Sequence, residues 1–189
     1  MMLSKFMGSL VGTGVGDSLG AGREGFSGYA ETREIGPRYT DDTHMMIGVA
    51  KSLIENKGFD GEHMIKTFIK NYEAEPWRGY GPGPPRIFRL IKQGESWDKA
   101  SEKLYSGGSF GNGSAMRVAP IGCFYYDNPT LLRQISYKSS RLTHSHPLGM
   151  EGAALQAYAV ALAINVEGSL DRDAFLGELE SFVKADIYK

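Results

Sequence analysis

Apolar residues recur at helical spacing along almost the whole chain, and this periodicity limits the fold more than any other feature. After residue 41, for example, Met46, Val49, Ala50 and Leu53 fall on one side of a helix. No segment shows the sustained alternation of Val, Ile and Thr with polar residues that half-buried strands need. We therefore expect an all-α fold.

The helix starts and ends are predicted from caps, prolines and glycines between the periodic stretches. An almost entirely apolar helix is expected to be central, because a helix without a polar face is usually buried. The predicted helices are 3–19, 42–55, one capped by Asp60 and ended by Pro76, one opened by Pro85, one capped by Ser96 and running to Leu104, 115–126 with a kink at Pro120, one capped by Asn128, the apolar helix 151–164, and one capped by Asp171 or Asp173.

Composition narrows the class of protein. The 189 residues carry 21 Lys and Arg against 22 Asp and Glu, a formal charge of −1, so nothing in the bulk charge favours a nucleic-acid partner. The one cysteine, Cys123, excludes an internal disulfide and fits a reducing compartment. No continuous run approaches the roughly 20 apolar residues of a membrane helix. We expect a cytoplasmic protein without a membrane partner.

A hydroxyl and two adjacent carboxylates stand directly before the helix that starts near residue 42. Adjacent like charges repel, so Asp41 and Asp42 need solvent or a cation, and together with Thr40 they offer oxygen ligands of the kind Mg2+ takes. The simpler interpretation is a helix cap, because Thr or Asp at this position satisfies free backbone N–H groups. Both roles are compatible, since one carboxylate can cap while the other faces a metal.

The glycine-rich stretch 107–114 is the second informative segment. Glycines let backbone N–H groups converge on an anion, especially ahead of a helix, and Arg117 lies near the expected helix start. The pattern has no P-loop lysine, so it is weak evidence for a nucleotide by itself. Phe110 is the lone aromatic residue in this stretch, where core packing offers little reason for it.

Three further side chains are candidates. Glu24 lies between Gly22 and Gly25 in a stretch with little periodicity, and is either a solvated loop acid or one of the functional residues that loops often carry. His144 and His146 are too close in sequence to share a helix face, so a helical metal pair is not expected. In a loop, either is a structural histidine or a donor to a ligand hydroxyl.

Taken together, these spaced stretches resemble the ADP-ribosyl-acceptor hydrolases, also called ADP-ribosylglycohydrolases. The resemblance extends over nearly the whole chain, and it is the combination that is specific. The matching pieces are Gly16-Asp17-Ser18-Leu19-Gly20 with Glu24, then Tyr39-Thr40-Asp41-Asp42-Thr43, Gly111-Asn112-Gly113-Ser114-Ala115-Met116-Arg117 and Ser140-Arg141-Leu142-Thr143-His144. Residues 77–81 and 108–113 look most like the branch that removes ADP-ribose from serine and degrades poly(ADP-ribose) or O-acetyl-ADP-ribose.

The resemblance implies a compact orthogonal helical domain with a pair of Mg2+ ions, or Mn2+, at the base of a cleft. Thr40, Asp41 and Asp42 match metal ligands, and Glu24, Asp41 and Asp42 match the catalytic acids. The substrate-binding positions that match are Gly108, Ser109, Phe110, Gly111, Asn112, Gly113 and His144. Of these, the glycine loop would hold the diphosphate, Phe110 would stack near the adenosine and His144 would contact a ribose.

One part of the family pattern is missing. Members carry an Asp-x-Asp-Thr/Ser motif near the C-terminus that completes the metal site. Here Asp171-Arg172-Asp173-Ala174 has the spacing without the hydroxyl, and it comes too early. We therefore expect residues 1–189 to form a single domain of the family that is truncated at its C-terminus.

The implied activity is Mg2+-dependent hydrolysis at C1 of the distal ribose, which releases ADP-ribose from a modified protein side chain or a related ADP-ribose conjugate. A non-catalytic ADP-ribose-binding module is the main alternative, since the second half of the metal site is missing. A third possibility is an inert helical interaction domain, which would not bind ADP-ribose at all.

Overall fold

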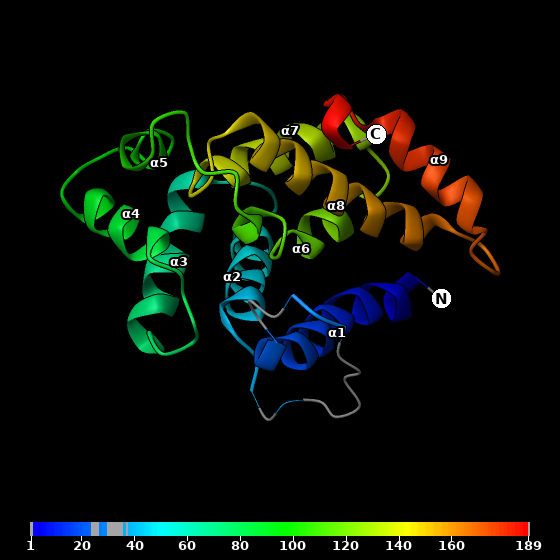
Figure 1. Cartoon of the computed structure of the whole chain (residues 1–189), viewed down its shortest axis with the longest axis horizontal. Helices are drawn as coiled ribbons and strands as arrows, with labels where there is room; N and C mark the ends of the chain where they lie inside the picture. Colours follow the sequence, from blue (N-terminus) through cyan, green and yellow to red (C-terminus); the bar gives the residue numbers. More distant parts are fainter. Residues whose placement is uncertain (1, 24–26, 30–35, 37, 189) are drawn as a thin grey trace.

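In the computed structural model, which describes residues 2–23, 27–29, 36 and 38–188, the chain is helical and the described residues include no strand (Figure 1). This confirms the all-α prediction. The helices are α1 Met2–Gly20, η1 Ala21–Arg23, α2 Asp41–Asn56, α3 Gly61–Ala74, α4 Gly83–Lys92, α5 Ala100–Leu104, η2 Asn112–Ser114, α6 Ala119–Phe124, α7 Pro129–Arg141, α8 Pro147–Asn165, α9 Arg172–Phe182 and η3 Asp186–Tyr188.

Two groups of helices meet along α2. On one side α2 packs against α3, which leads to α4 and α5; on the other it packs against α6 and α1 (Figure 1). The long helix α8 lies against α6, α7, α1 and α9. A continuous core joins both groups, and its fully buried members include Val49, Phe68, Ile121, Leu132 and Ala157.

The caps predicted from short polar side chains are mostly present. Asp60, Asn128 and Asp171 each accept a hydrogen bond from the backbone N–H three residues on, at the starts of α3, α7 and α9. The prediction for Ser96 is wrong, because α5 begins only at Ala100. Such polar caps are local interactions, so the sequence usually reveals them.

The predicted helix 115–126 is also wrong in its extent. Residues 115–117, which follow the short η2 helix, form a turn, and α6 begins only at Ala119 with Pro120 in its first turn. Proline has no N–H to donate and is well placed at a helix start, where that donor has no helical partner. Pro120 thus marks the beginning of a helix and does not kink one.

The apolar helix α8 begins one turn earlier than predicted. By length and hydropathy alone, Pro147–Asn165 would pass as a membrane-spanning helix, although core helices pass the same test. Its Ala153, Ala154, Ala157 and Ala161 are buried against its neighbours, as expected for a central helix. Small side chains let these helices approach closely: a Cβ on Gly122 of α6 would lie 2.6 Å from the Ala157 carbonyl oxygen.

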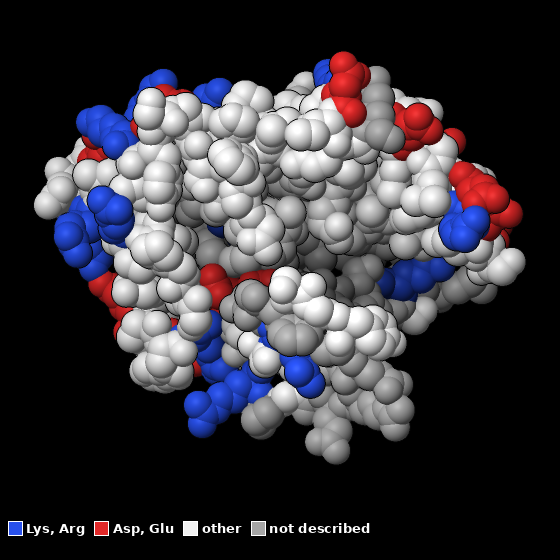
Figure 2. Space-filling model, viewed as in Figure 1, with Lys and Arg blue, Asp and Glu red and all other residues white. Residues whose placement is uncertain are grey.

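The surface is unevenly charged. On the face shown in Figure 2, most Lys, Arg, Asp and Glu side chains lie towards the margins, some basic ones lie in its lower middle, and acidic atoms are recessed in a hollow beside α2. Exposed apolar side chains gather elsewhere, on α1, where Leu3, Met7 and Val11 are 70%, 57% and 61% exposed. These three residues are spaced four apart and form one stripe along the helix.

Candidate functional site

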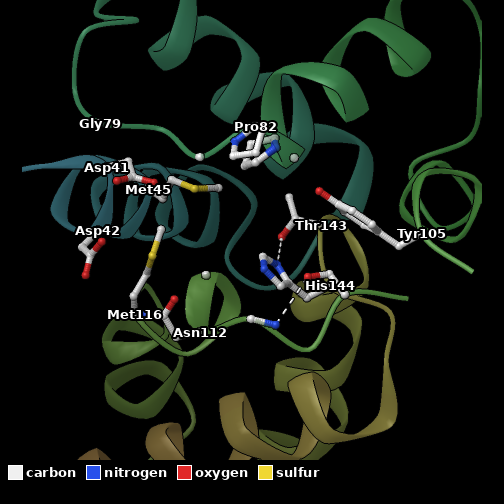
Figure 3. Close-up of a pocket in the computed structure, with 16 residues that line it drawn as sticks. Asp41, Asp42, Met45, Gly79, Pro82, Tyr105, Asn112, Met116, Thr143 and His144 are labelled. Atoms are coloured by element: carbon white, nitrogen blue, oxygen red, sulfur yellow. Dashed lines mark hydrogen bonds between the residues drawn. The ribbon is translucent and has the colours of Figure 1, made fainter. Parts of the chain in front are cut away.

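A cleft of about 310 Å3 brings together the main stretches singled out from the sequence (Figure 3). The start of α2 forms one wall, the loop before α4 and the start of that helix a second, and Tyr105, the segment 109–116, Thr143 and His144 the rest. The predicted residues that line it are Asp41, Asp42, Ser109, Gly111, Asn112, Gly113 and His144. Gly108 and Phe110 lie beside the cleft, in adjoining hollows.

Asp17 on α1 holds the start of α2. Its carboxylate accepts hydrogen bonds from the backbone N–H groups of Thr40 and Thr43, at 2.8 and 3.1 Å, and from both threonine hydroxyls, each at 2.6 Å. The Thr40 side chain makes no cap of its own. The capping of α2 therefore comes from another helix, and the expectation of a local cap by Thr40 is wrong.

This arrangement also orients the Thr40 hydroxyl. Its single hydrogen is donated to Asp17, while Asp42 Oδ1 lies farther away, at 3.5 Å. The oxygen lone pairs remain for another partner. Sequence reasoning placed Asp17 in a family motif but gave it no role, because its contact with α2 spans more than twenty residues of chain.

Asp41 and Asp42 both reach the cleft from the first turn of α2, where the positive end of the helix dipole favours negative charge. Asp41 is nearly buried, and its Oδ1 lies 3.7 Å from the position that a Cβ on Gly79 would occupy. Together with Thr40 they present hydroxyl and carboxylate oxygens, which suit Mg2+.

The remaining part of a metal site is not found in the described part of the chain. There, no three His, Cys, Asp or Glu side chains are grouped so that they could hold an ion. Glu24, the predicted mobile acid, lies outside the described residues. Asp171 caps α9 and Asp173 pairs with Arg172 on the surface, so these acids serve other purposes.

The glycine loop is packed closely against the segment that carries the histidines. A Cβ on Gly113 would lie 2.6 Å from His144 Cε1, and one on Gly108, which has a φ of +83°, would lie 2.3 Å from the His146 backbone nitrogen. Glycine is required there by close approach and by backbone conformation. Close packing therefore explains why these positions are glycine, independently of any role of the loop in binding an anion.

Phe110 projects from this loop into solvent. Its side chain is 69% exposed, and its ring meets the edge of His146 with centroids 5.2 Å apart. His146 in turn accepts a hydrogen bond from the Leu148 N–H and caps α8. His146 is thus structural, whereas Phe110 is available to a ligand.

His144 is a buried residue at the wall of the cleft. Its Nδ1 lies 2.8 Å from the Thr143 hydroxyl, and its backbone carbonyl accepts a hydrogen bond from Ser140. Burial, with the nearby Arg117 charge, lowers the pKa of His144 to about 3. The imidazole is therefore neutral near pH 7. His144 is hydrogen-bonded within the protein and also lines the cleft, so the structural and the ligand-facing roles considered from the sequence are compatible.

The loop 77–81 supports the same wall through contacts that the sequence did not reveal. Arg78 donates to the Tyr39 carbonyl at 3.1 Å and lies over the Tyr39 ring at 3.8 Å. The Tyr80 hydroxyl lies 3.0 Å from His44 Nδ1. Burial lowers the pKa of His44, and burial together with Asp41 raises the pKa of Tyr80. The neutral phenol of Tyr80 thus faces the neutral imidazole of His44 near Asp41.

Comparison with known proteins gives matches along nearly the whole chain. The family model described as ADP-ribosylglycohydrolase matches residues 2–188. ADP-ribosylhydrolase ARH3 of Danio rerio is 36% identical over 209 residues, which cover 100% of this chain and 56% of that protein. The protein of the same name from Homo sapiens is 33% identical over 204 residues, covering 94% and 55%.

A solved structure agrees with these matches. A chain of an "ADP-ribosylglycohydrolase-related protein complex" superposes with a TM-score of 0.74 at 27% identity, covering 94% of this chain and 61% of its own length. The present chain spans little more than half the length of the curated relatives it matches. Because the family model covers residues 2–188, this chain belongs to the ADP-ribosylglycohydrolase family.

Proposed function

We propose that the cleft binds the ADP-ribose part of a modified protein side chain or related conjugate, and that a protein containing this chain hydrolyses the bond at C1 of the distal ribose with Mg2+. The observation that carries this proposal is that Asp41 and Asp42 share one cleft with the glycine loop and His144. The cleft volume of about 310 Å3 lies at the lower end of the range for small-molecule pockets.

Each wall has a part in this reaction. Thr40, Asp41 and Asp42 would hold Mg2+, or Mn2+, and the chemistry such ions supply when bound is orientation of ribose hydroxyls and a more acidic water. One of the two aspartates accepts a proton from the attacking water, while departure of the acceptor builds oxocarbenium character. Glu24 would assist from its loop. Gly108 to Gly113 hold the diphosphate, Phe110 stacks near the adenosine and His144 contacts a ribose.

The acceptor is proposed from the two loops. Residues 77–81 and 108–113 resemble the branch that acts on ADP-ribosyl-serine, poly(ADP-ribose) and O-acetyl-ADP-ribose, and the relatives above bear the name ADP-ribosylhydrolase ARH3. A peptide ADP-ribosylated on serine is therefore the substrate of choice for a first assay.

The test measures release of free ADP-ribose from that peptide, with Mg2+ and with EDTA. The assay uses residues 1–189 and a longer chain that carries an Asp-x-Asp-Thr/Ser segment. We expect the longer chain to release ADP-ribose in the presence of Mg2+, and we expect EDTA to abolish this turnover. Turnover that is unaffected by EDTA would refute the metal requirement, and no turnover by the longer chain would refute the enzyme.

A non-catalytic ADP-ribose-binding module remains the second candidate for residues 1–189 by themselves. It is favoured because the described residues hold no group of three acidic, His or Cys side chains able to bind an ion. Calorimetric titration with ADP-ribose separates the cases: binding without turnover in either chain supports the module, whereas no binding by either supports an inert interaction domain.

A further inference from the structure

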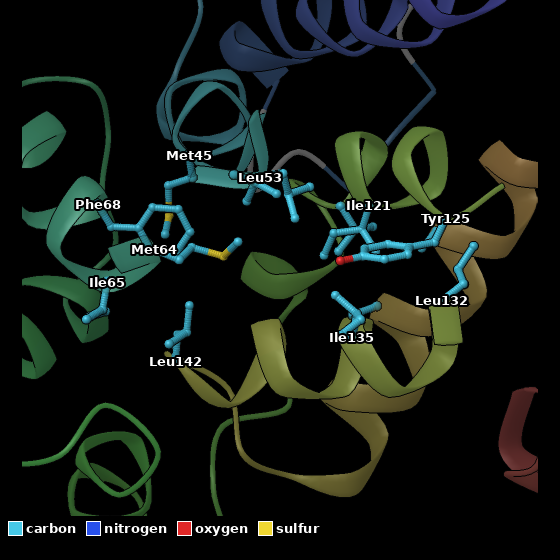
Figure 4. Close-up of a cluster of buried hydrophobic side chains, with 14 of the residues drawn as sticks. Met45, Leu53, Met64, Ile65, Phe68, Ile121, Tyr125, Leu132, Ile135 and Leu142 are labelled. Atoms are coloured by element: carbon cyan, nitrogen blue, oxygen red, sulfur yellow. The ribbon is translucent and has the colours of Figure 1, made fainter. Parts of the chain in front are cut away.

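Arg117 is a buried cation behind the cleft. It is the largest of the fully buried side chains, at 0% exposed, and none of the ion pairs found among the described residues includes it. Its guanidinium donates to the Thr143 hydroxyl and to the Ser139 carbonyl, both at 2.8 Å, and lies 4.9 Å from the Phe68 ring centroid. Figure 4 shows Phe68 and Met45 in this part of the core.

Such a residue is costly, because a charge buried without a carboxylate loses its hydration for only a few hydrogen bonds. In addition, Arg117 Nε has no hydrogen-bond partner. Burial lowers the pKa of Arg117 to about 9, so the group still carries its charge near neutral pH. An apolar side chain at this position would avoid the cost but could not donate a hydrogen bond to the Thr143 hydroxyl.

The Thr143 hydroxyl connects this charge to the cleft. A guanidinium only donates, so Thr143 Oγ1 must accept from Arg117. Within the described structure, the other partner of this hydroxyl is His144 Nδ1, at 2.8 Å (Figure 3). Oγ1 has two lone pairs, but if it accepted from both Arg117 and Nδ1 its own hydrogen would be donated to neither group. The geometry therefore favours donation of that hydrogen to an unprotonated Nδ1.

The proton of the neutral ring then resides on Nε2. This atom faces the glycine loop, where a Cβ on Gly111 would lie 3.5 Å from it and one on Gly113 would lie 3.0 Å from it. We propose that Arg117 and Thr143 are positioning residues that fix His144 in its neutral Nε2–H form, so that it presents a hydrogen-bond donor to a hydroxyl or phosphate oxygen of the ligand. The choice of ligand rests on the proposed function.

The surroundings keep this form across the working pH range. Burial, together with the Arg117 charge, disfavours the imidazolium and lowers the pKa of His144 to about 3, so the ring carries a single proton near neutral pH. Among the described residues that line the cleft, the other ionisable ones are Asp41, Asp42 and Tyr105. A second cation next to Arg117 would be repelled in a medium of low dielectric constant.

The first measurement needs no ligand. In protein labelled with 15N at histidine, long-range proton–nitrogen correlation distinguishes the two neutral tautomers and the imidazolium, and His144→Gln assigns the signal. At about pH 7, near the usual pKa of histidine, we expect a protonated Nε2 and an unprotonated Nδ1. A proton on Nδ1, or an imidazolium, would overturn the proposal whatever the protein binds.

The second measurement uses a matched pair. Thr143→Val removes the hydroxyl at nearly constant volume, and Thr143→Ser keeps it. We expect the valine variant to lose the fixed tautomer and to bind ADP-ribose about tenfold more weakly, the equivalent of one hydrogen bond. The serine variant should keep both properties. A valine variant that folds and retains the parent spectrum would refute the role of Thr143.

The two proposals fail separately. If the parent protein shows the Nε2–H form but does not bind ADP-ribose, the proposed function is wrong while the positioning of His144 stands. If Thr143→Val does not fold, the spectra of the parent and of Thr143→Ser still decide the tautomer, because a link through the hydroxyl predicts the same Nε2–H signature in both.

Discussion

Asp41 and Asp42 occupy the same turn of α2, yet the structure gives the capping of that turn to Asp17. The local alternative considered from the sequence, in which Thr or Asp at this position serves mainly as the cap, therefore loses most of its support. The carboxylates face the cleft with the Thr40 hydroxyl beside them. Their chemistry can be tested one oxygen at a time.

Asp41→Asn and Asp42→Asn should each weaken Mg2+ binding, measured by calorimetry in the longer chain, and should reduce ADP-ribose release. An amide has one oxygen and no charge, so it is a poorer ligand for Mg2+. If these residues were caps only, the change would cost little, because Asn caps about as well as Asp. Asp60→Asn, at a true cap outside the cleft, is the control. Full activity in both variants would rule out the metal role.

Phe110→Ala should weaken ADP-ribose binding by about tenfold or more, since stacking on a base contributes roughly 1–3 kcal/mol. The side chain is 69% exposed, so the melting temperature should stay nearly unchanged. Calorimetry and a thermal melt of the same sample check both statements. An equal loss of stability would mean that the contact between Phe110 and His146 supports the loop, and that Phe110 is not a ligand platform.

At the scale of elements, the Asp17 carboxylate links α1 to the start of α2 by accepting four hydrogen bonds, two from N–H groups and two from hydroxyls. This junction sets the position of the first turn of α2, and with it the direction of Asp41 and Asp42. The glycines of the loop 107–113 act in a similar way, because their lack of a side chain lets the loop lie against His144 and His146.

Asp17→Ala should therefore destabilise the protein by about 1–3 kcal/mol, the usual cost of leaving partly buried donors unpaired. It should also weaken Mg2+ binding, because the Thr40 hydroxyl is released. Urea denaturation and calorimetry measure the two effects. Asp171→Ala removes an exposed cap on α9 and serves as the control: it should cost about 1 kcal/mol with no effect on Mg2+. An Asp17 variant as stable as its parent would contradict the junction.

At the scale of the molecule, buried ionisable groups tie stability to pH. Burial lowers the pKa of His44 and of His144, the latter to about 3, whereas unfolded histidine titrates near 6.5. Glu151 is buried too, but the hydrogen bonds from the Lys184 N–H, Tyr137 and Arg133 outweigh burial and hold its pKa below the usual value. This network fastens the segment after α9 onto α7 and α8.

We therefore expect stability to fall on acidification in two stages. As the pH drops below about 6.5, the unfolded chain takes up protons that the folded histidines do not, so the free energy of unfolding decreases. The contribution of Glu151 is present above its unfolded pKa and is lost only as the pH falls through its lower folded pKa. Urea midpoints across this range measure the effect, and His44→Gln should reduce the first stage. A flat profile between neutral and mildly acidic pH would contradict neutral buried histidines.

The chain spans little more than half of its relatives, and we expect residues 1–189 by themselves to associate in solution, to bind Mg2+ weakly and to hydrolyse ADP-ribosyl-serine negligibly. The large apolar side chains of α8 are not among the exposed ones, so this helix offers no apolar face for association. The apolar stripe lies on α1 and favours association. Light scattering tests this, and Met7→Gln with Val11→Gln should reduce it. A monomeric, fully active 1–189 would refute the expectation.

The sequence by itself determined the helical class, most helix positions and the caps at Asp60, Asn128 and Asp171, because these depend on periodicity and on contacts three or four residues apart. It also identified the stretches that line the cleft, and the family to which they point. Those stretches combine residue types that packing alone does not require, such as adjacent aspartates and an exposed phenylalanine in a glycine loop.

Only the tertiary structure decided how these stretches work together. The bonds from Asp17 to Thr40 and Thr43, and the chain from Arg117 through Thr143 to His144, join residues that are distant in sequence or are oriented by buried neighbours. No local pattern encodes such contacts, since they depend on where α1, α2 and α7 are placed by the core. The direction in which the Thr40 hydroxyl donates, and the contact of His144 with Thr143 at the wall of the cleft, follow from that placement.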